Sequence, residues 1–324
     1  TPALSNLFPA LRLSSADGPS AELEPDLRVS VSGAGGETLG SCALWWRDTP
    51  RFQGRTVGYI GKYSARDPES AGRLLHVACR RLAGQGRMLA IGPVDGSTWM
   101  DYRCIVDAGS EPPFFLEPRN PPECPDHFRA AGFEPLAYYR SSVQEDLSTH
   151  DARLVTADAR MKDIGIRIRA FDTQRVEEEL RRIHALTLES FTQSLLFKPI
   201  PVDTFIARYR VLMQTIDPEL VLLAEHRGRL VGYLFALSNA LELTRGQRIE
   251  TVILKTIAVL PARQYAGLGH VLAMHGAGQA RALGYTRAIH ALMREGNGSA
   301  NWSARLGRPI RRYALFAKAL DGLR

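Results

Sequence analysis

The chain contains few cysteines and no long hydrophobic run. Only four of its 324 residues are cysteine. Cys42, Cys79, Cys104 and Cys124 form no CxxC pair and have no histidine at metal-ligand spacing, so we expect reduced thiols and neither a disulfide framework nor a metal site. No run of 18 apolar residues occurs, so we expect no membrane-spanning helix. No signal peptide is recognisable, and we expect a cytoplasmic protein.

Lysine is also scarce, although the chain is basic. Lysine supplies only five of the 41 basic residues, while the net charge is +7 and the pI about 9.4. The arginines are spread among acidic residues instead of forming one block, and no aromatic-basic motif for nucleic acid is present. The charge therefore favours an anionic ligand, and it leaves nucleic acid as an open alternative.

One segment of the second half, Thr251–Leu272, joins a strand to a helix through a turn with two glycines. Thr251–Leu260 is rich in β-branched and apolar residues, as in a buried strand, and Pro261 ends it. A helix start carries unpaired N–H groups and partial positive charge, which bind a diphosphate. Gly267 and Gly269 leave room for close approach, so this turn is a candidate phosphate site.

The spacing Q/R-x-x-G-x-G/A after a strand that ends in V-x-P resembles the signature of the GNAT acyltransferase superfamily. Gln264, Gly267 and Gly269 occupy its three positions. The predicted element order over residues 164–324, β-α-α-β-β-β-α-β-α-β, is also that of a GNAT domain. The predicted elements are Ile166–Phe171, Val176–Phe191, Val202–Met213, Glu219–Glu225, Leu230–Leu237, Thr251–Leu260, the helix after Gly267, Ala288–Met293, Ser299–Leu306 and Arg312–Ala317.

This resemblance implies a site for acetyl-coenzyme A, or another acyl-coenzyme A, and no metal. The implied coenzyme-binding residues lie on the motif strand, in its turn and at a later helix start. They are Ile257, Ala258, Val259, Gln264, Tyr265, Ala266, Gly267, Leu268, Gly269, His270, Asn297 and Ser299. For Asn297 and Ser299, capping of the helix is the alternative interpretation.

The residues for proton transfer depart from the GNAT pattern. Many GNAT enzymes place a glutamate on the motif strand, where this chain has Ile253 and Lys255. Many also carry a helix tyrosine, where this chain has Trp302 and Ser303. The substitute candidates are Lys255, which would orient an acceptor carboxylate, His290 as the base, Tyr313 as the acid, and Glu189 near the expected acceptor pocket. Each has a structural alternative: an edge lysine, a packed histidine, an ordinary strand residue and an exposed helix glutamate. Strand alternation predicts that Lys255 faces the same side as Ile253 and Ile257.

The first half repeats the scheme loosely, so we expect two tandem GNAT-like domains, each with a mixed, mostly antiparallel sheet flanked by helices. The expected boundaries are 1–145 for a degenerate domain, 146–163 for a linker, and 164–324 for the coenzyme-binding domain. The linker is expected because residues 146–163 are polar and lack the apolar spacing of both a helix and a strand. At the place of a phosphate turn, the first half has two carboxylates, and Asp67 before Pro68 predicts a capped helix instead. The proline-rich stretch Pro112–Pro122 either packs over the sheet or forms a substrate wall.

The expected function is transfer of an acetyl group from acetyl-coenzyme A to the amine of a small molecule or amino-acid-like metabolite, at a site in the C-terminal domain. One alternative keeps the fold but uses an acyl-carrier-protein or aminoacyl-tRNA donor. Another is a non-catalytic coenzyme A-binding or sensing protein. The aromatic residues Phe191, Phe197, Tyr209 and Phe235 either line an acceptor or acyl pocket or belong to the core.

Overall fold

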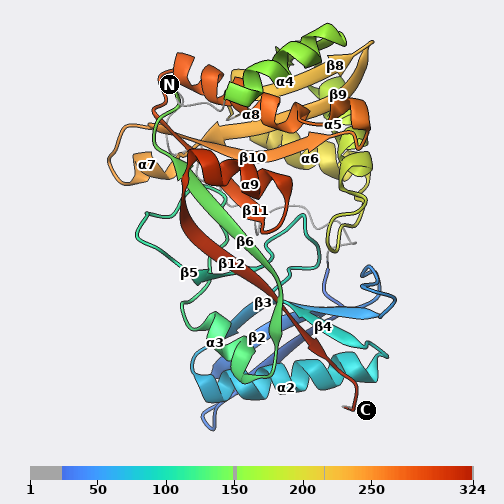
Figure 1. Ribbon diagram of the computed structural model, residues 1–324. Coiled ribbons are helices and arrows are strands. Elements are labelled where there is room, and N and C mark those ends of the chain that lie inside the picture. The colour runs from blue at the N-terminus through green and yellow to red at the C-terminus, as the bar shows by residue number, and fades with distance from the viewer. Residues whose placement is uncertain (1–23, 149–151, 215, 323–324) are drawn as a thin grey trace.

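The structure is a computed structural model that describes residues 24–148, 152–214 and 216–322. Within these residues, twelve strands form one mixed and mostly antiparallel sheet flanked by helices (Figure 1), which confirms the expected fold class. In spatial order the strands are β1 (Leu27–Ser32), β2 (Thr38–Trp45), β3 (Val57–Ala65), β4 (Leu89–Gly92), β12 (Arg308–Ala319), β6 (Glu134–Gln144), β11 (Arg287–Arg294), β10 (Thr251–Val259), β9 (Arg229–Ser238), β8 (Val221–His226) and β7 (Ile166–Ala170); β5 (Cys104–Asp107) pairs with β12.

The two halves of the chain exchange strands at the middle of this sheet. β6, from the first half, pairs with β11, and Ser142 lies opposite His290. β12, the last strand of the chain, pairs with both β6 and β4, and Ala317 lies opposite Ile91. Figure 1 shows both strands running through the centre of the molecule from one half to the other. Each half therefore completes its part of the sheet with a strand from the other.

Helices cover both faces of the sheet. They are α2 (Pro68–Gly84), α3 (Cys124–Ala130), α4 (Ala152–Asp163), α5 (Val176–Phe191), α6 (Val202–Met213), α7 (Leu241–Thr244), α8 (Leu268–Ala282) and α9 (Gly298–Leu306), with short 3-10 helices η3 (Thr173–Arg175), η4 (Pro218–Leu220) and η5 (Arg263–Tyr265). The predicted cap of α2 is confirmed, because Asp67 Oδ1 accepts a 2.8 Å hydrogen bond from the Ser70 N–H. No helix in the described ranges is both long enough and apolar enough to cross a bilayer.

Most of the segment expected as a linker forms α4, which packs against α8. Leu154 and Met161 of α4 are buried in the large core of the second half. Asp158 Oδ1 and His275 Nε2 share a 2.8 Å contact between the two helices. Leu154, Ala157 and Met161 recur at helical spacing, but the many polar and charged residues between them make this pattern weak. α4 is therefore part of the packed second half.

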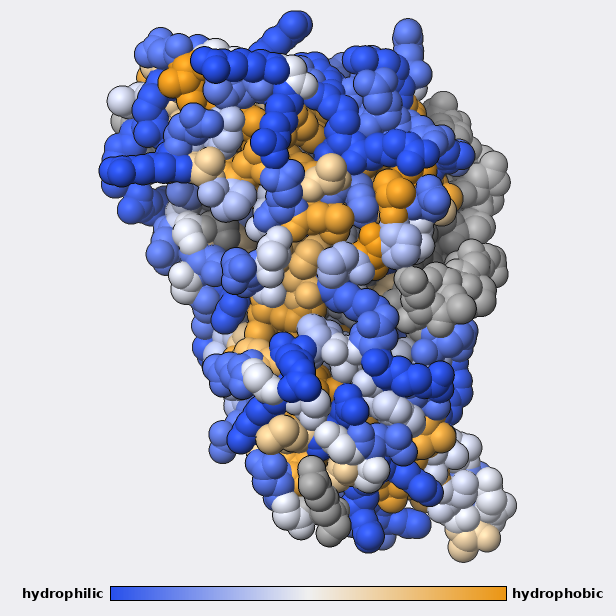
Figure 2. Space-filling view, turned by 90° about the vertical axis from the view of Figure 1, so that its right-hand side faces the viewer, coloured by the Kyte–Doolittle hydropathy of each residue, from blue (hydrophilic) through white to orange (hydrophobic). Residues whose placement is uncertain are grey.

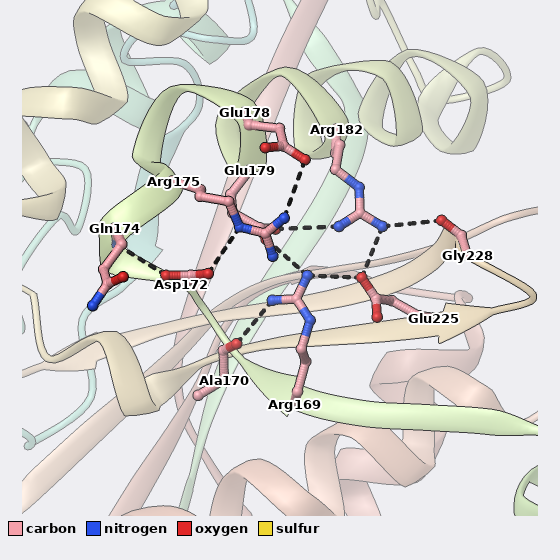
Figure 3. A network of polar contacts seen from close by, with 10 residues as sticks. All are labelled: Arg169, Ala170, Asp172, Gln174, Arg175, Glu178, Glu179, Arg182, Glu225 and Gly228. Atoms are coloured by element: carbon pink, nitrogen blue, oxygen red, sulfur yellow. Dashed lines mark hydrogen bonds and ion pairs between the residues drawn. The ribbon is translucent and has the colours of Figure 1, made fainter.

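A network of ion pairs holds α5 against the edge of the sheet (Figure 3). Arg169 of β7 donates hydrogen bonds of 2.7 Å to Glu179 of α5 and to Glu225 of β8. The Glu179 side chain is fully buried, and Arg182 adds a 2.8 Å ion pair to Glu225. A buried carboxylate requires partners of this kind. The network holds the first turn of α5 in place. Further along, α5 lines the cavity beside Thr256, which is described below.

Figure 2 shows the side of the molecule that lies on the right in Figure 1. Hydrophilic side chains cover most of this side, and hydrophobic ones are visible in a band down its middle. Large apolar residues are otherwise seldom exposed in the described parts of the chain: Met88, Val155, Val211 and Leu283 are the exceptions. The apolar side chains are therefore mostly used in the core.

Candidate functional site

β10 and β11 begin as a parallel pair and then separate. Thr251–Leu254 of β10 pairs with Arg287–His290 of β11, whereas β10 stays paired with β9 as far as Val259. Leu254 lies opposite Ala236, and Thr256 lies opposite Phe235, so Lys255 has no partner on β9. Such an extra residue is a β-bulge, which bends a strand away from a neighbour. A gap between β10 and β11 therefore opens at Lys255.

The bulge also changes which side chains share a face. Leu254 and Ile257 both pack toward α8, near Gly276 and Gly269. In a regular strand, residues three positions apart would face opposite sides. Ile253 and Ile257 therefore lie on opposite faces, and the prediction that Lys255 shares one face with both of them is wrong. Strand alternation fails here because the sequence does not reveal the bulge.

The backbone of β10 presents free N–H groups to this gap. The Leu260 N–H donates to the Val231 carbonyl of β9 at 2.9 Å. Backbone groups alternate in direction along an antiparallel strand, so the Ala258 N–H also points to β9. The N–H groups of Ile257 and Val259 then point to the opposite side, where β11 no longer pairs. An extended ligand in the gap can bond to these two groups.

The glycine turn follows directly at the end of β10. Gly267 is the residue before α8 and has a φ of +91°, which glycine adopts without strain. Gly269 faces the side chains of Ile257 and Val259. Leu268 is fully buried, and Tyr265 is held by a 2.9 Å hydrogen bond between its hydroxyl and His226 Nδ1. The turn is thus anchored by its apolar and aromatic residues.

Sequence reasoning missed one cation at this turn. Arg160 of α4 donates a hydrogen bond from Nη2 to the Ala266 carbonyl. A Cβ on Gly267 would lie 3.5 Å from the same nitrogen. The guanidinium therefore stands beside the unpaired N–H groups at the start of α8, where an anion is favoured. No local motif marks Arg160, because α4 is joined to the turn only by packing.

The other expected coenzyme-binding residues lie around the gap. Gln264 is exposed in η5, and His270 on the first turn of α8 stacks on Trp302 at 5.8 Å between ring centres. Asn297 is the N-cap residue of α9, but its side chain makes no capping hydrogen bond. Ser299 lies in the first turn of the same helix.

The proline-rich loop of the first half reaches the bulge. Lys255 Nζ donates a 2.9 Å hydrogen bond to the carbonyl of Leu116. The lysine side chain is partly exposed, yet protein surrounds its ammonium group. Burial, with the positive charge of Arg103, lowers the pKa of Lys255 to about 7. At neutral pH this lysine is therefore a mixture of amine and ammonium.

Glu117 lies next to Leu116 and is locked in a buried polar cluster. Arg311 Nη1 donates to Glu117 at 2.6 Å, and the Tyr313 hydroxyl donates to the other carboxylate oxygen. Ser141 Oγ lies 3.0 Å from the Tyr313 hydroxyl. Burial raises the pKa of Glu117 in spite of these donors, and burial also raises the pKa of Tyr313. The cluster fixes the loop that holds Lys255.

The structure brings together two of the four residues considered for catalysis. Lys255 and Tyr313 both contact the loop at Leu116 and Glu117. His290 instead faces α9, where its ring stacks on Trp302 at 4.8 Å and Nδ1 lies 2.8 Å from Ser303 Oγ. Burial lowers the pKa of His290 to about 4.

The fourth candidate, Glu189, lies on the surface of α5. It accepts hydrogen bonds of 2.8 and 2.9 Å from Arg229 Nη2. Glu117, by contrast, was not considered from sequence. Its partners Arg311 and Tyr313 lie almost two hundred positions later in the chain, so no local pattern could mark it.

An apolar cavity of about 10 Å³ lies beside Thr256, the residue after the bulge. Tyr209 and Phe235, two of the aromatic residues singled out from sequence, line it together with Leu180, Ile183, Phe205, Met213 and Tyr233. Phe191 and Phe197 pack against each other instead, with ring centres 6.2 Å apart. A cavity of this size accommodates no more than a methyl group or one water.

A larger hollow of about 550 Å³ lies on the opposite face of the sheet, between α4, α8 and α9. Met274, Arg281 and Trp302 are among its lining residues. Its lining residue Trp302 stacks on His270 in the first turn of α8, whereas Arg281 lies near the end of that helix. The hollow therefore extends along α8 from the side of the glycine turn. Among the residues that the structure describes, no group of three or more histidine, cysteine or acidic side chains could hold a metal ion.

Comparison with known proteins gives matches in structure only. No family profile matches the chain. No curated protein matches it either. Several structural matches nevertheless cover 90% or more of the chain.

Three of these solved structures are described as GCN5-related N-acetyltransferases. A glucosamine N-acetyltransferase region of a fungal multi-domain β-N-acetylglucosaminidase has a TM-score of 0.56 at 13% identity; the match covers 95% of this chain and 34% of that one. An N-acetyltransferase from Anabaena variabilis has a TM-score of 0.54 at 9% identity, covering 98% and 71%. One from Sphaerobacter thermophilus has a TM-score of 0.50 at 14% identity, covering 90% and 80%.

The chain thus spans about a third of the length of the first of these proteins. At such low identities the likeness concerns the fold. The chain therefore has the GNAT fold.

Proposed function

We propose that this protein is an N-acyltransferase that moves an acetyl group from acetyl-coenzyme A to the amine of a small molecule. The reaction centre is the gap between β10 and β11 in the second half of the chain. The observation that carries this proposal is the continuous path from the bulge at Lys255, along the open side of β10, to the turn at Gly267.

The donor lies along this path. Its diphosphate binds the first N–H groups of α8, with Arg160 as an additional positive charge. Its extended arm bonds to the N–H groups of Ile257 and Val259, as an added strand would. The thioester then reaches the bulge. The cavity of about 10 Å³ beside Thr256 receives the methyl group, which favours acetyl over longer acyl groups.

Lys255 is the proton acceptor in this mechanism. A neutral acceptor amine attacks the thioester carbonyl carbon, and a backbone N–H of β10 at the bulge stabilises the oxyanion. The nitrogen then loses a proton to the Lys255 amine, whose pKa of about 7 suits a base at neutral pH. When the carbon–sulfur bond breaks, the Lys255 ammonium returns the proton to the coenzyme thiolate.

Glu117 and Tyr313 do not transfer a proton in this mechanism; they hold the loop whose carbonyl positions Lys255. Glu117 is bonded to Arg311, to Tyr313 and to the Phe114 N–H, so the neighbouring Leu116 carbonyl is held in one place. That carbonyl orients the Lys255 amine toward the gap. The first half of the chain thus supplies the support for a base that lies in the second half.

The donor site is tested by two glycine substitutions on α8. Gly269→Glu places a carboxylate against Ile257 and Val259 without the left-handed backbone that Gly267 requires. Gly278→Glu, the control, adds the same charge to the same helix where nothing lies within 4 Å. We expect calorimetry to show acetyl-coenzyme A binding by the wild type and by Gly278→Glu, and none by Gly269→Glu.

Equal affinity in all three proteins would contradict this donor site. A folded wild type that binds no acetyl-coenzyme A would remove the proposal and favour a carrier-protein or aminoacyl-tRNA donor. Donor binding without release of coenzyme A, across a broad amine panel, would favour the non-catalytic sensing alternative.

A further inference from the structure

Two side chains of opposite charge stand near Lys255 without an ion-pair partner among the described residues. Arg208 of α6 is half-buried, and its guanidinium makes one hydrogen bond, from Nη1 to Met100 Sδ at 3.0 Å. Asp101 follows Met100, and its carboxylate has no hydrogen bond or ion pair to another described residue. Both charges therefore remain available to a ligand.

The other half-buried arginines among the described residues have oxygen partners: Arg87 and Arg140 donate to backbone carbonyls, and Arg55 pairs with Asp321. Arg169, Arg182 and Arg287 each bond to at least one glutamate. Sulfur is a weak acceptor, so Met100 satisfies little of the hydrogen-bonding capacity of a guanidinium with five N–H donors. A partly desolvated guanidinium without an oxygen acceptor is unfavourable unless a ligand supplies one. Arg208 is thus the exception that needs an explanation.

Asp101 and Arg208 lie close to the reacting centre as well as to each other. Arg208 lies on α6, which with α5 covers the cavity beside Thr256. Asp101 lies in the segment of the first half where Trp99 packs against Phe205 of α6. The charge of Asp101 raises the pKa of Lys255, and that of Arg208 lowers it, so both act on the Lys255 amine.

Arg103 completes the surroundings but is already engaged. Its guanidinium stacks on the rings of Tyr102 and Tyr139 at 3.9 and 4.0 Å and donates to the Leu292 carbonyl at 3.0 Å. Glu117 is likewise engaged by Arg311. Asp95 and Lys62, whose charges also act on Asp101, form an ion pair of 2.8 Å with each other. Among these described side chains, the charges left for a ligand are therefore one cation on α6 and one anion on the facing segment.

We propose that the acceptor is a free amino acid, whose carboxylate binds Arg208 and whose ammonium group binds Asp101 before it releases one proton to solvent and becomes the attacking neutral amine. This inference rests on the proposed acetyl transfer and specifies its second substrate. A ligand that carries both charges satisfies both side chains together, and its amino group then lies next to the proton acceptor Lys255. An amine without a carboxylate supplies no partner for the Arg208 guanidinium.

The test compares acceptors that differ only in the carboxylate. The panel contains the protein amino acids, β-alanine and γ-aminobutyrate, each beside its methyl ester and its decarboxylated amine, and release of coenzyme A is measured. A charge-assisted hydrogen bond distinguishes such pairs by roughly tenfold or more. We expect kcat/KM for the best amino acid to exceed that of its ester and amine by at least about tenfold.

Arg208→Gln should remove this preference, through a higher KM for the amino acid and an unchanged KM for its ester. Arg210→Gln is the matched control, because Arg210 lies on the same helix, is exposed and pairs with Glu177 at 2.6 Å. Asp101→Asn should raise KM for the amino acid, its ester and its amine alike. Folding of each variant is checked by its melting temperature.

The outcomes separate this inference from the proposed function. If acetyl-coenzyme A binds and esters or simple amines are acetylated as fast as the amino acids, the acceptor class is wrong and the acyltransferase stands. If donor binds but no amino acid is acetylated, the acceptor class is equally overturned. Absence of donor binding would remove both proposals.

Discussion

Lys255 Nζ donates a 2.9 Å hydrogen bond to the carbonyl of Leu116, a residue 139 positions earlier in the chain. This contact joins the bulge of β10 to the proline-rich loop of the first half. Of the two interpretations left open for residues 112–122, it supports the substrate wall, because the loop lies against the residue that we propose as the base.

Replacing Lys255 by arginine separates charge from proton transfer. Lys255→Arg keeps a donor for Leu116, but a guanidinium is not deprotonated in proteins. We expect kcat to fall by about 100-fold or more, as for the loss of a general base. Calorimetry should show acetyl-coenzyme A affinity within about threefold of the wild type. A variant with nearly full kcat would show that Lys255 is not the base.

The same residue predicts a pH profile. Because the amine form is the active one, kcat should rise with pH through about 7 and level off above it. The lowered pKa also makes folding depend on pH: between pH 7 and 10 the unfolded chain binds more protons, so stability rises with pH. Urea denaturation of Lys255→Met should lack this rise. Identical stability profiles in the two proteins would contradict a lowered pKa.

Glu117 and Arg311 should be coupled in stability. Each is almost completely buried, and each would be left without its charged partner if the other were replaced. We expect Glu117→Gln and Arg311→Met each to lower the free energy of unfolding by about 3 kcal/mol, and the double variant to cost less than the sum. Urea denaturation of the wild type, the two single variants and the double variant gives the four free energies of unfolding. Simple additivity would show that the pair does not interact as described.

Arg160 should contribute to donor binding through the diphosphate. We expect Arg160→Met to weaken acetyl-coenzyme A binding by about tenfold at low salt, and less at high salt, because one charge-assisted contact is lost. S-acetyl-pantetheine, which has no diphosphate, should bind equally to both proteins. Lys162→Met is the control, since Lys162 lies on the same helix and pairs with Asp158 at 2.7 Å. An equal loss for both ligands would mean that Arg160 only supports α4.

We expect the Glu179 side chain to stabilise the fold and that of its neighbour Glu178 to contribute little. Glu179 is fully buried among Arg169, Arg175 and Arg182, whereas Glu178 is exposed on the same turn of α5. Glu179→Gln should lower the free energy of unfolding by about 3 kcal/mol, and Glu178→Gln by less than about 0.5 kcal/mol. Thermal and urea unfolding test the pair. Similar effects of both changes would contradict a specific role for the buried network.

The glycine turn was predictable because its determinants lie close together in the sequence. Thr251–Leu260 was predicted as a strand and forms β10, and the helix expected after Gly267 begins at Leu268. β-branched residues, Pro261 and two glycines act on their own backbone and its neighbours. The helix at Asp67 and Pro68 was predicted for the same reason.

The bulge at Lys255 and the helix α4 were not predictable in this way. A bulge depends on the pairing of β10 with β9, and nothing in the residues around Lys255 marks it. α4 has a weak apolar pattern, and it packs because α8 offers a surface for Leu154 and Met161. In both cases a neighbouring element decides the local structure.

By itself, the sequence determined the strand, the turn and the helix start of the proposed donor site, because short-range backbone preferences and hydrophobic periodicity act within about twenty residues. The tertiary structure decided the strand exchange of β6 and β12 and the meeting of Lys255 with Leu116 and Glu117. It also decided the positions of Asp101 and Arg208. Strand pairing and buried polar contacts join residues that are distant in the chain, so only the folded packing determines which partners meet.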